Sequence, residues 1–277
     1  MSRLSPDRLL IGFAPGELSL VRLRGRWRPK VVEKRSVVAS DPAGGAEPWR
    51  GAVAALKPAL AAAASQALDA TVVLSSHLVR YALIPWSDSL RSEKEEQAYC
   101  RHHFARIFGE RAKGWVPRAS EAPKGGGPRL ASAIDAGLVD GLRECFSEKR
   151  NARLVSVQPY LMAAFNRWRT SIPESGAWLL LLEPDRASLA LYSEQSWRAV
   201  QSAKGRFGAP EDWAALLQRE RHRVEGEVPD LVLVAGTPGA RLDWPRVDGW
   251  QFRSLALPES SQFPQAESER YALALCA

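Results

Sequence analysis

Hydrophobic and polar residues alternate in short runs at two places in the chain, and each place predicts three strands joined by tight turns. Runs of this length, separated by turn residues such as Pro and Gly, are typical of antiparallel hairpins. We therefore expect a three-stranded antiparallel meander at the start of each half of the chain. The six predicted strands cover residues 9–14, 18–24, 30–38, 178–182, 187–192 and 197–202.

Each meander is followed by a helical pattern and then by a continuous apolar run. In the first half, Trp49, Val53, Leu56 and Leu60 recur at the spacing of one helix face, and "APEDWAALLQRERHRVEG" predicts the helix of the second half. The runs "ATVVLSS" and "DLVLVAG" are typical of buried strands in parallel pairing. The order strand, strand, strand, helix, strand therefore occurs twice, which predicts a mixed α/β (α+β) chain with a duplicated plan.

The stretch between the two copies predicts an inserted subdomain. "HLVRYALIPW" predicts a strand, and Ser92 with Glu95 forms a capping box at the start of a helix. We expect Cys100, Phe104, Ile107 and Phe108 on the apolar face of that helix. Two further strands flank the turn "PKGGG". We therefore expect a first lobe over residues 1–172, with an insertion at about 77–134, and a smaller second lobe over 173–277.

The chain is mildly basic, which raises a nucleic-acid hypothesis. Its formal net charge is +7, and the densest basic cluster is Arg22, Arg24, Arg26 and Arg28 around Trp27. Basic and acidic residues are interspersed elsewhere, so a solvated hairpin tip is the favoured interpretation of the cluster. Nucleic-acid binding is kept as an alternative that the composition favours only weakly.

Motifs that carry chemistry are missing from the sequence. It contains no Walker loop, no GxGxxG and no GxSxG elbow. Its three cysteines are far apart, and His102 and His103 are adjacent rather than at the i, i+4 spacing of a metal pair. The Ala-rich stretch 52–68 is interrupted by Lys57, Pro58 and Gln66 and would partition poorly into lipid. We expect no catalytic residue, no metal site and no membrane span.

The duplicated plan resembles that of the actin-like, sugar kinase and Hsp70 ATPase superfamily, whose two lobes share an RNase H-like fold. Within this superfamily the chain is most similar to the PilM-like scaffolds of type IV pilus assembly and to the cytoplasmic domains of GspL and MshI. "IGFAPGELSLVRL" looks like the first phosphate turn with its strands, "WLLLLEPDRASLALYSEQSWRAVQS" like the second phosphate hairpin, and "LVLVAGTPGARL" like the adenosine segment.

The resemblance also identifies the positions of a nucleotide cleft whose motifs are degenerate. Those positions are Gly12, Ala14, Pro15, Gly16, Glu183, Asp185, Gly236 and Gly239. Family members carry an acid where Ala14 stands, and Pro15 has no N–H to donate. The second turn keeps two acids but lacks a glycine, so its carboxylates would repel phosphate. We therefore expect binding of ATP and Mg²⁺ to be weak or absent.

As a function, the resemblance implies a non-catalytic, pseudo-ATPase scaffold of a type IV pilus or type II secretion assembly platform. It implies a cytoplasmic location peripheral to the inner membrane and a PilN-like membrane partner whose cytoplasmic tail binds near Leu78–Phe108. A homo-oligomer is compatible with it. One alternative is an active ATP-dependent enzyme of the same fold, such as a small-molecule kinase. The other is the basic nucleic-acid-binding module.

Overall fold

The computed structural model groups the chain into two compact units. The first comprises Met1–Leu78, Ala136–Arg167 and Leu257–Ala277, and the second comprises Val79–Asp135 and Trp168–Ala256. The structure describes residues 6–25, 27, 29–40, 47–63, 67–87, 90, 92–121, 126–148, 151–205, 210–236, 249–255, 257 and 270–277. The predicted lobe boundaries, 1–172 and 173–277, follow the duplicated sheets rather than these contact units and stay a prediction.

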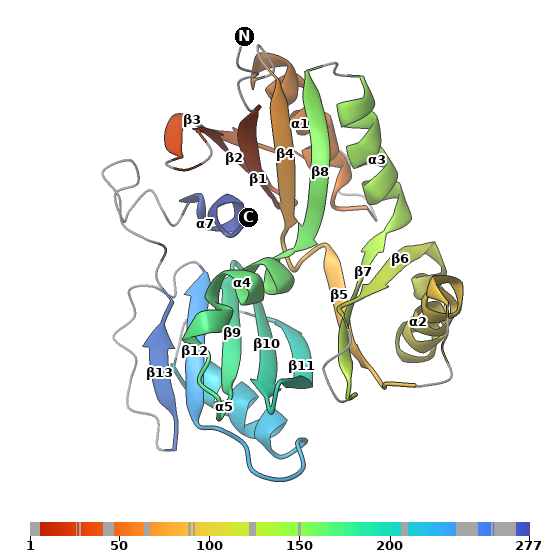
Figure 1. The fold of residues 1–277 in the computed structure, drawn as a ribbon, viewed down its shortest axis with the longest axis vertical. Coiled ribbons are helices and arrows are strands. Elements are labelled where there is room, and N and C mark those ends of the chain that lie inside the picture. Colours follow the sequence, from red (N-terminus) through yellow and green to blue (C-terminus); the bar gives the residue numbers. More distant parts are fainter. Residues whose placement is uncertain are drawn as a thin grey trace. The chain divides into compact units, whose positions relative to one another are not determined.

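The first unit contains a five-stranded mixed sheet in the order β3-β2-β1-β4-β8 (Figure 1). Its strands are β1 (Asp7–Phe13), β2 (Glu17–Arg24), β3 (Lys30–Val38), β4 (Leu68–Leu74) and β8 (Ala152–Pro159). The pairs β1–β2 and β2–β3 are antiparallel, whereas β4 runs parallel to both β1 and β8. The predicted meander and the buried parallel strand after it are confirmed.

The second unit repeats this order in a sheet arranged β11-β10-β9-β12-β13. Its strands are β9 (Ala177–Glu183), β10 (Arg186–Ser193), β11 (Ser196–Lys204), β12 (Leu231–Gly236) and β13 (Gln251–Ser254). The meander β9–β10–β11 is antiparallel, and β12 is parallel to β9 and β13. Two sheets with the same order and the same directions confirm the predicted duplication.

Helices α1 (Arg50–Ala63) and α5 (Pro210–Arg221) form where the sequence patterns predicted a helix after each meander. The first unit contains α1, α3 (Ala136–Ser147) and α7 (Ala272–Leu275). Helix α4 (Tyr160–Trp168) belongs to it up to Arg167, and the 3₁₀ turn Arg169–Ser171 that follows belongs to the second unit. Helix α1 continues through Pro58 and packs against α3, β2 and β3. In the second unit, α5 (Pro210–Arg221) contributes Trp213 and Leu217 to a core shared with the sheet, where Trp178 is fully buried.

Alternation along β1 sends its side chains to both faces of the sheet, and both faces are covered. Leu9, Ile11 and Phe13 share one face and are buried. Leu10 lies on the other face, in a cluster with Val21 and with residues of α7. A strand buried on both sides reads as a nearly continuous apolar run, which explains the sequence pattern "LLIGF".

The insertion forms a smaller sheet in the order β5-β7-β6. Its elements are β5 (Val79–Ile84), α2 (Glu93–Phe108), the 3₁₀ turn Gly109–Gly114, β6 (Trp115–Ala119) and β7 (Arg129–Asp135). The Ser92 side chain accepts a hydrogen bond from the Glu95 N–H, so the predicted cap is confirmed. Cys100 and Phe104 are buried as expected. The prediction for Ile107 was wrong, because its side chain is 52% exposed.

A buried ion pair joins the first two strands. Arg22 Nε donates to Asp7 Oδ2 at 2.8 Å, and both residues are buried. Arg24 reaches Asp7 Oδ1 at 3.4 Å, and Glu33 lies 3.9 Å from Arg22 Nη1. Two desolvated charges of this kind depend on each other, because each would be costly to bury alone.

Replacing Asp7 with Ala should therefore lower the free energy of unfolding by about 3 kcal/mol, since Arg22 would remain buried without the carboxylate that lies 2.8 Å from its Nε. The matched control is Asp140→Ala, which removes an exposed partner of Arg143 and should change stability by less than about 0.5 kcal/mol. Urea denaturation of the intact chain measures the free energy of unfolding of each variant. Equal losses in the two variants would show that the buried pair has no special role.

None of the helices within the described ranges combines the length and the apolar character needed to cross a membrane.

Candidate functional site

The first of the predicted phosphate turns connects β1 to β2 and is closed by its own backbone. The Ala14 N–H donates to the Glu17 carbonyl at 3.1 Å, and the Gly16 carbonyl accepts the Ala39 N–H at 2.9 Å. Pro15 has no N–H. Within the three described turn residues Ala14–Gly16, this leaves the Gly16 N–H as the donor that could face a ligand. A single amide is far less than the convergent set that cradles a phosphate.

Gly12 lies next to this turn and serves packing. A Cβ at this position would collide with the Ser19 hydroxyl and would lie 2.8 Å from the backbone nitrogen of Ala274. The missing side chain therefore lets the backbone at α7 approach β1. The sequence places Gly12 among the cleft positions, and the structure gives it a local reason that involves no ligand.

The second turn is the two-residue connection Pro184-Asp185 between β9 and β10, where Glu183 pairs with Arg186. Asp185 has φ +56°, a left-handed conformation that costs a non-glycine residue about 1–2 kcal/mol. Pro184 and Asp185 are exposed, and the Asp185 carbonyl accepts the Gly205 N–H at 3.1 Å. This turn presents a carboxylate where the family's turn would present amide groups.

Gly236 belongs to the predicted adenosine segment. It is the last residue of β12 and lies opposite Leu182 of β9. Its φ is +102°, and a Cβ there would collide with the Leu182 carbonyl oxygen. Glycine is therefore required by the approach of two backbones. Gly239, the other glycine of the predicted adenosine segment, lies outside the described residues.

The three cysteines, the strongest nucleophiles and metal ligands by residue type, are all buried. Cys100, Cys145 and Cys276 are buried free thiols, and burial raises the pKa of Cys100 and Cys145 above the ordinary value. A thiol with a raised pKa is a poor nucleophile at neutral pH. Among the described residues, no three His, Cys, Asp or Glu side chains are grouped closely enough to hold a metal ion.

Arg22 of the basic hairpin is not exposed to a ligand. Arg22 is buried in the ion pair with Asp7, so it is not available to an external anion. Arg26 and Arg28 lie outside the described residues. Trp27, between them in sequence, is 91% exposed. The structure thus removes one of the four arginines on which the nucleic-acid hypothesis rests.

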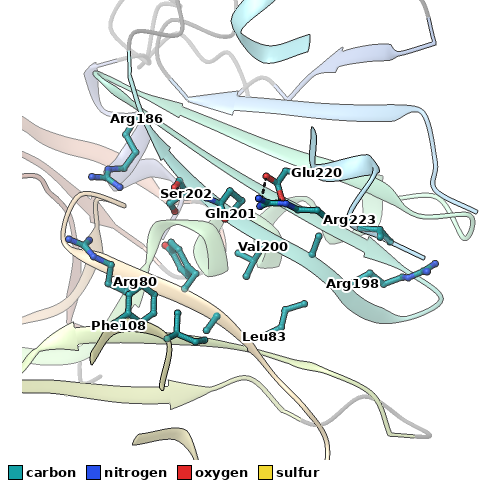
Figure 2. A pocket seen from close by; sticks show the side chains of 15 residues that line it. Arg80, Leu83, Phe108, Arg186, Arg198, Val200, Gln201, Ser202, Glu220 and Arg223 are labelled. Carbon is teal, nitrogen blue, oxygen red and sulfur yellow. Dashed lines mark hydrogen bonds and ion pairs between the residues drawn. The ribbon is translucent and has the colours of Figure 1, made fainter. Parts of the chain in front are cut away.

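The second unit contains a cavity of about 610 Å³ that the sequence did not predict (Figure 2). One wall comes from β5 and the last turn of α2, and the other comes from β11 and the end of α5. Strands β5 and β11 lie close together in this unit. Four arginines contribute to the lining, namely Arg80, Arg186, Arg198 and Arg223. They are up to 143 positions apart in the sequence, so no motif could reveal them.

Comparison with known proteins rests on structure alone, since no family model and no curated protein matches the sequence. A Bacteroides thetaiotaomicron protein of actin-like ATPase fold is 13% identical, with a TM-score of 0.57 over 85% of this chain and 84% of that one. The chain has an actin-like fold.

Two further solved structures are similar to this chain over most of its length. The PilM–PilN type IV pilus biogenesis complex contains a chain that is 16% identical, with a TM-score of 0.69 over 97% of this chain and 96% of that one. The cytoplasmic domain of EpsL, an inner-membrane component of the Vibrio cholerae type II secretion system, is 12% identical, with a TM-score of 0.57 over 91% and 90%. The predicted likeness to PilM-like and GspL-like proteins is confirmed at the level of the fold.

Replacing Gly236 with Ala should lower the free energy of unfolding by at least about 3 kcal/mol, because the new Cβ would have to displace the β9 backbone and adopt a strained φ. Gly16→Ala is the matched control, since no heavy atom lies within 4 Å of the Cβ it would add. The soluble yield and the urea midpoint of each variant measure its loss of stability. If Gly16→Ala were as damaging as Gly236→Ala, the packing explanation of these glycines would be refuted.

Proposed function

We propose that this chain is a non-catalytic cytoplasmic scaffold of a type IV pilus or type II secretion assembly platform. The observation that carries the proposal is the similarity to the PilM–PilN complex, which extends over 97% of the chain with a TM-score of 0.69. The likeness to the EpsL cytoplasmic domain, part of an inner-membrane component, supports the same role and a position beside the inner membrane. At such low identity the fold alone is shared, so the role needs a direct test.

The proposed partner is the cytoplasmic tail of a PilN-like inner-membrane protein. PilM is found with PilN in the solved complex, which supports a partner of the same class for this chain. The segment expected to lie near the tail, Leu78–Phe108, forms β5 and α2 of the insertion. An insertion with its own core can present a binding surface without disturbing the sheets.

The non-catalytic part of the proposal is supported by the turns. A phosphate loop needs several amide N–H groups and an acid that manages the metal ion. The first turn has Ala14 in place of the acid and Pro15 in place of an amide donor. The second turn replaces glycine with Pro184 and Asp185, which presents a negative charge.

An active ATP-dependent enzyme of the same fold is the alternative that these turns disfavour. Isothermal titration calorimetry of the intact chain with Mg-ATP should detect no binding tighter than about 1 mM, because the turns offer few donors and unneutralised carboxylates. A dissociation constant in the micromolar range, or measurable phosphate release, would contradict the non-catalytic assignment and favour the enzyme.

The scaffold role predicts a stable complex with the tail. The PilN-like protein of the same organism supplies the probe, a synthetic peptide that covers its cytoplasmic segment. This peptide should co-purify with the intact chain, and calorimetry should give a dissociation constant of about 10 µM or tighter. A peptide with the same residues in scrambled order is the control. Absence of binding, or equal binding of the scrambled peptide, would contradict the proposed partner.

A further inference from the structure

The hairpin between β2 and β3 presents a large aromatic side chain to solvent. Trp27 lies in its connection, residues 25–29, and is 91% exposed. Trp86 is 40% exposed, whereas Trp178 and Trp213 are fully buried. A ring left in water forgoes the free energy that burial of its apolar surface would give. A partner that covers Trp27 would gain that free energy.

Two basic side chains lie opposite each other at the base of this connection. Arg24 ends β2, Lys30 begins β3, and the two are direct partners across the strands. Both are exposed, and like charges in this position repel each other. Arg24 lies 3.4 Å from an oxygen of Asp7, but that carboxylate also accepts a hydrogen bond from Arg22 at 2.8 Å. Within the described ranges Lys30 has no ion-pair partner. An anion beside the hairpin would relieve the repulsion.

The same end of the sheet carries further positive charge. Arg8, the second residue of β1, is exposed and has no ion-pair partner among the residues that the structure describes. Asp69 is its neighbour on β4, but both oxygens of that carboxylate accept hydrogen bonds of 2.9 Å from Arg153. The sequence adds Arg26 and Arg28 to the connection. Because the carboxylate is already paired, the unpaired charge that the described residues present at this end is positive.

An exposed ring beside several cations fits the interface of a lipid bilayer. Tryptophan is enriched at the headgroup level of membranes, where its ring meets apolar groups and its N–H stays hydrated. Lys and Arg side chains near the surface are attracted to anionic headgroups. Single-stranded nucleic acid is bound differently, in a groove along which several aromatic side chains stack on successive bases. Residues 17–38 contain one aromatic side chain, Trp27, so the bilayer is the favoured partner.

We propose that the tip of the β2–β3 hairpin binds the surface of an anionic phospholipid membrane. Trp27 enters the headgroup layer, and Arg24, Lys30 and Arg8 lie against the anionic headgroups. The contact is made at the surface and requires no helix that crosses the bilayer. It goes beyond the proposed scaffold function, because the ligand is lipid and no protein partner takes part.

Flotation of the intact chain with lipid vesicles tests the proposal. One set of vesicles contains phosphatidylcholine with about 30% phosphatidylglycerol, which gives a negative surface potential, and the other contains phosphatidylcholine alone. The chain should bind the anionic vesicles at least about tenfold more tightly than the neutral ones. Binding should weaken as the salt concentration rises, because salt screens the headgroup charge.

Variants locate the contact. Trp27→Ser should weaken binding by about tenfold through lost apolar contact, and Lys30→Gln by about fivefold through the loss of one cation. Trp27→Tyr should stay within about threefold of the original chain, because tyrosine also favours the interface. Two controls should leave binding unchanged. Val38→Ser alters an exposed apolar residue at the other end of β3, and Arg106→Gln removes an exposed arginine of α2.

Three outcomes would overturn the proposal. Equal binding to neutral and anionic vesicles would remove the role of charge. Unchanged binding of Trp27→Ser, shown by its melting temperature to be folded, would place the lipid contact elsewhere. A single-stranded oligonucleotide of about twenty bases that binds more tightly than the anionic vesicles, and is lost in Trp27→Ser and Lys30→Gln, would assign the hairpin to nucleic acid. Because the vesicles contain no protein, these results are separate from those of the tail peptide.

Discussion

The architecture depends on one constraint, the parallel pairing of the first strand of each meander with the strand that follows the helix. In the first unit β1 pairs with β4, and in the second β9 pairs with β12. The pairing brings the meander turn and the end of the parallel strand to the same edge of each sheet. The Ser75 N–H donates to the Phe13 carbonyl at this edge of the first sheet, and Gly236 lies opposite Leu182 at the equivalent edge of the second. Side chains on both faces of β1 and β9 are buried.

Close packing around the sheets gives two glycines a reason to be present that is separate from nucleotide chemistry. Gly12 makes room for the backbone at α7, and Gly236 makes room for the carbonyl of Leu182. Both are therefore needed by the fold even if no phosphate ever binds. Ala14 has no carboxylate to hold a metal ion, and Pro15 and Pro184 have no N–H to donate to a phosphate. The frame of the fold is thus present without the groups that would hold phosphate, which supports the proposed scaffold role.

Much of the fold could be predicted because its signals are local. The apolar alternation, the helical spacing of Leu56 and Leu60 and the Ser92 cap all depend on residues within a few positions of one another. The features that the sequence did not predict depend on residues that are far apart in the chain. By sequence Arg22 belongs to a basic cluster, but in the structure its side chain is paired with Asp7 on the adjacent strand. Ile107 fits the apolar face of α2 by spacing, yet it lies at the cavity. The cavity itself joins Arg80 with Arg186, which only the folded second unit brings together.

The central claim is that the turns are retained for the fold and not for nucleotide. The most direct test is the melting temperature of the intact chain with and without about 5 mM Mg-ATP, since a ligand that binds only the folded state stabilises it by about 2.7 kcal/mol at one hundred times its dissociation constant. The account predicts the same melting temperature in both samples. A reproducible rise of several degrees that requires both ATP and Mg²⁺ would contradict it.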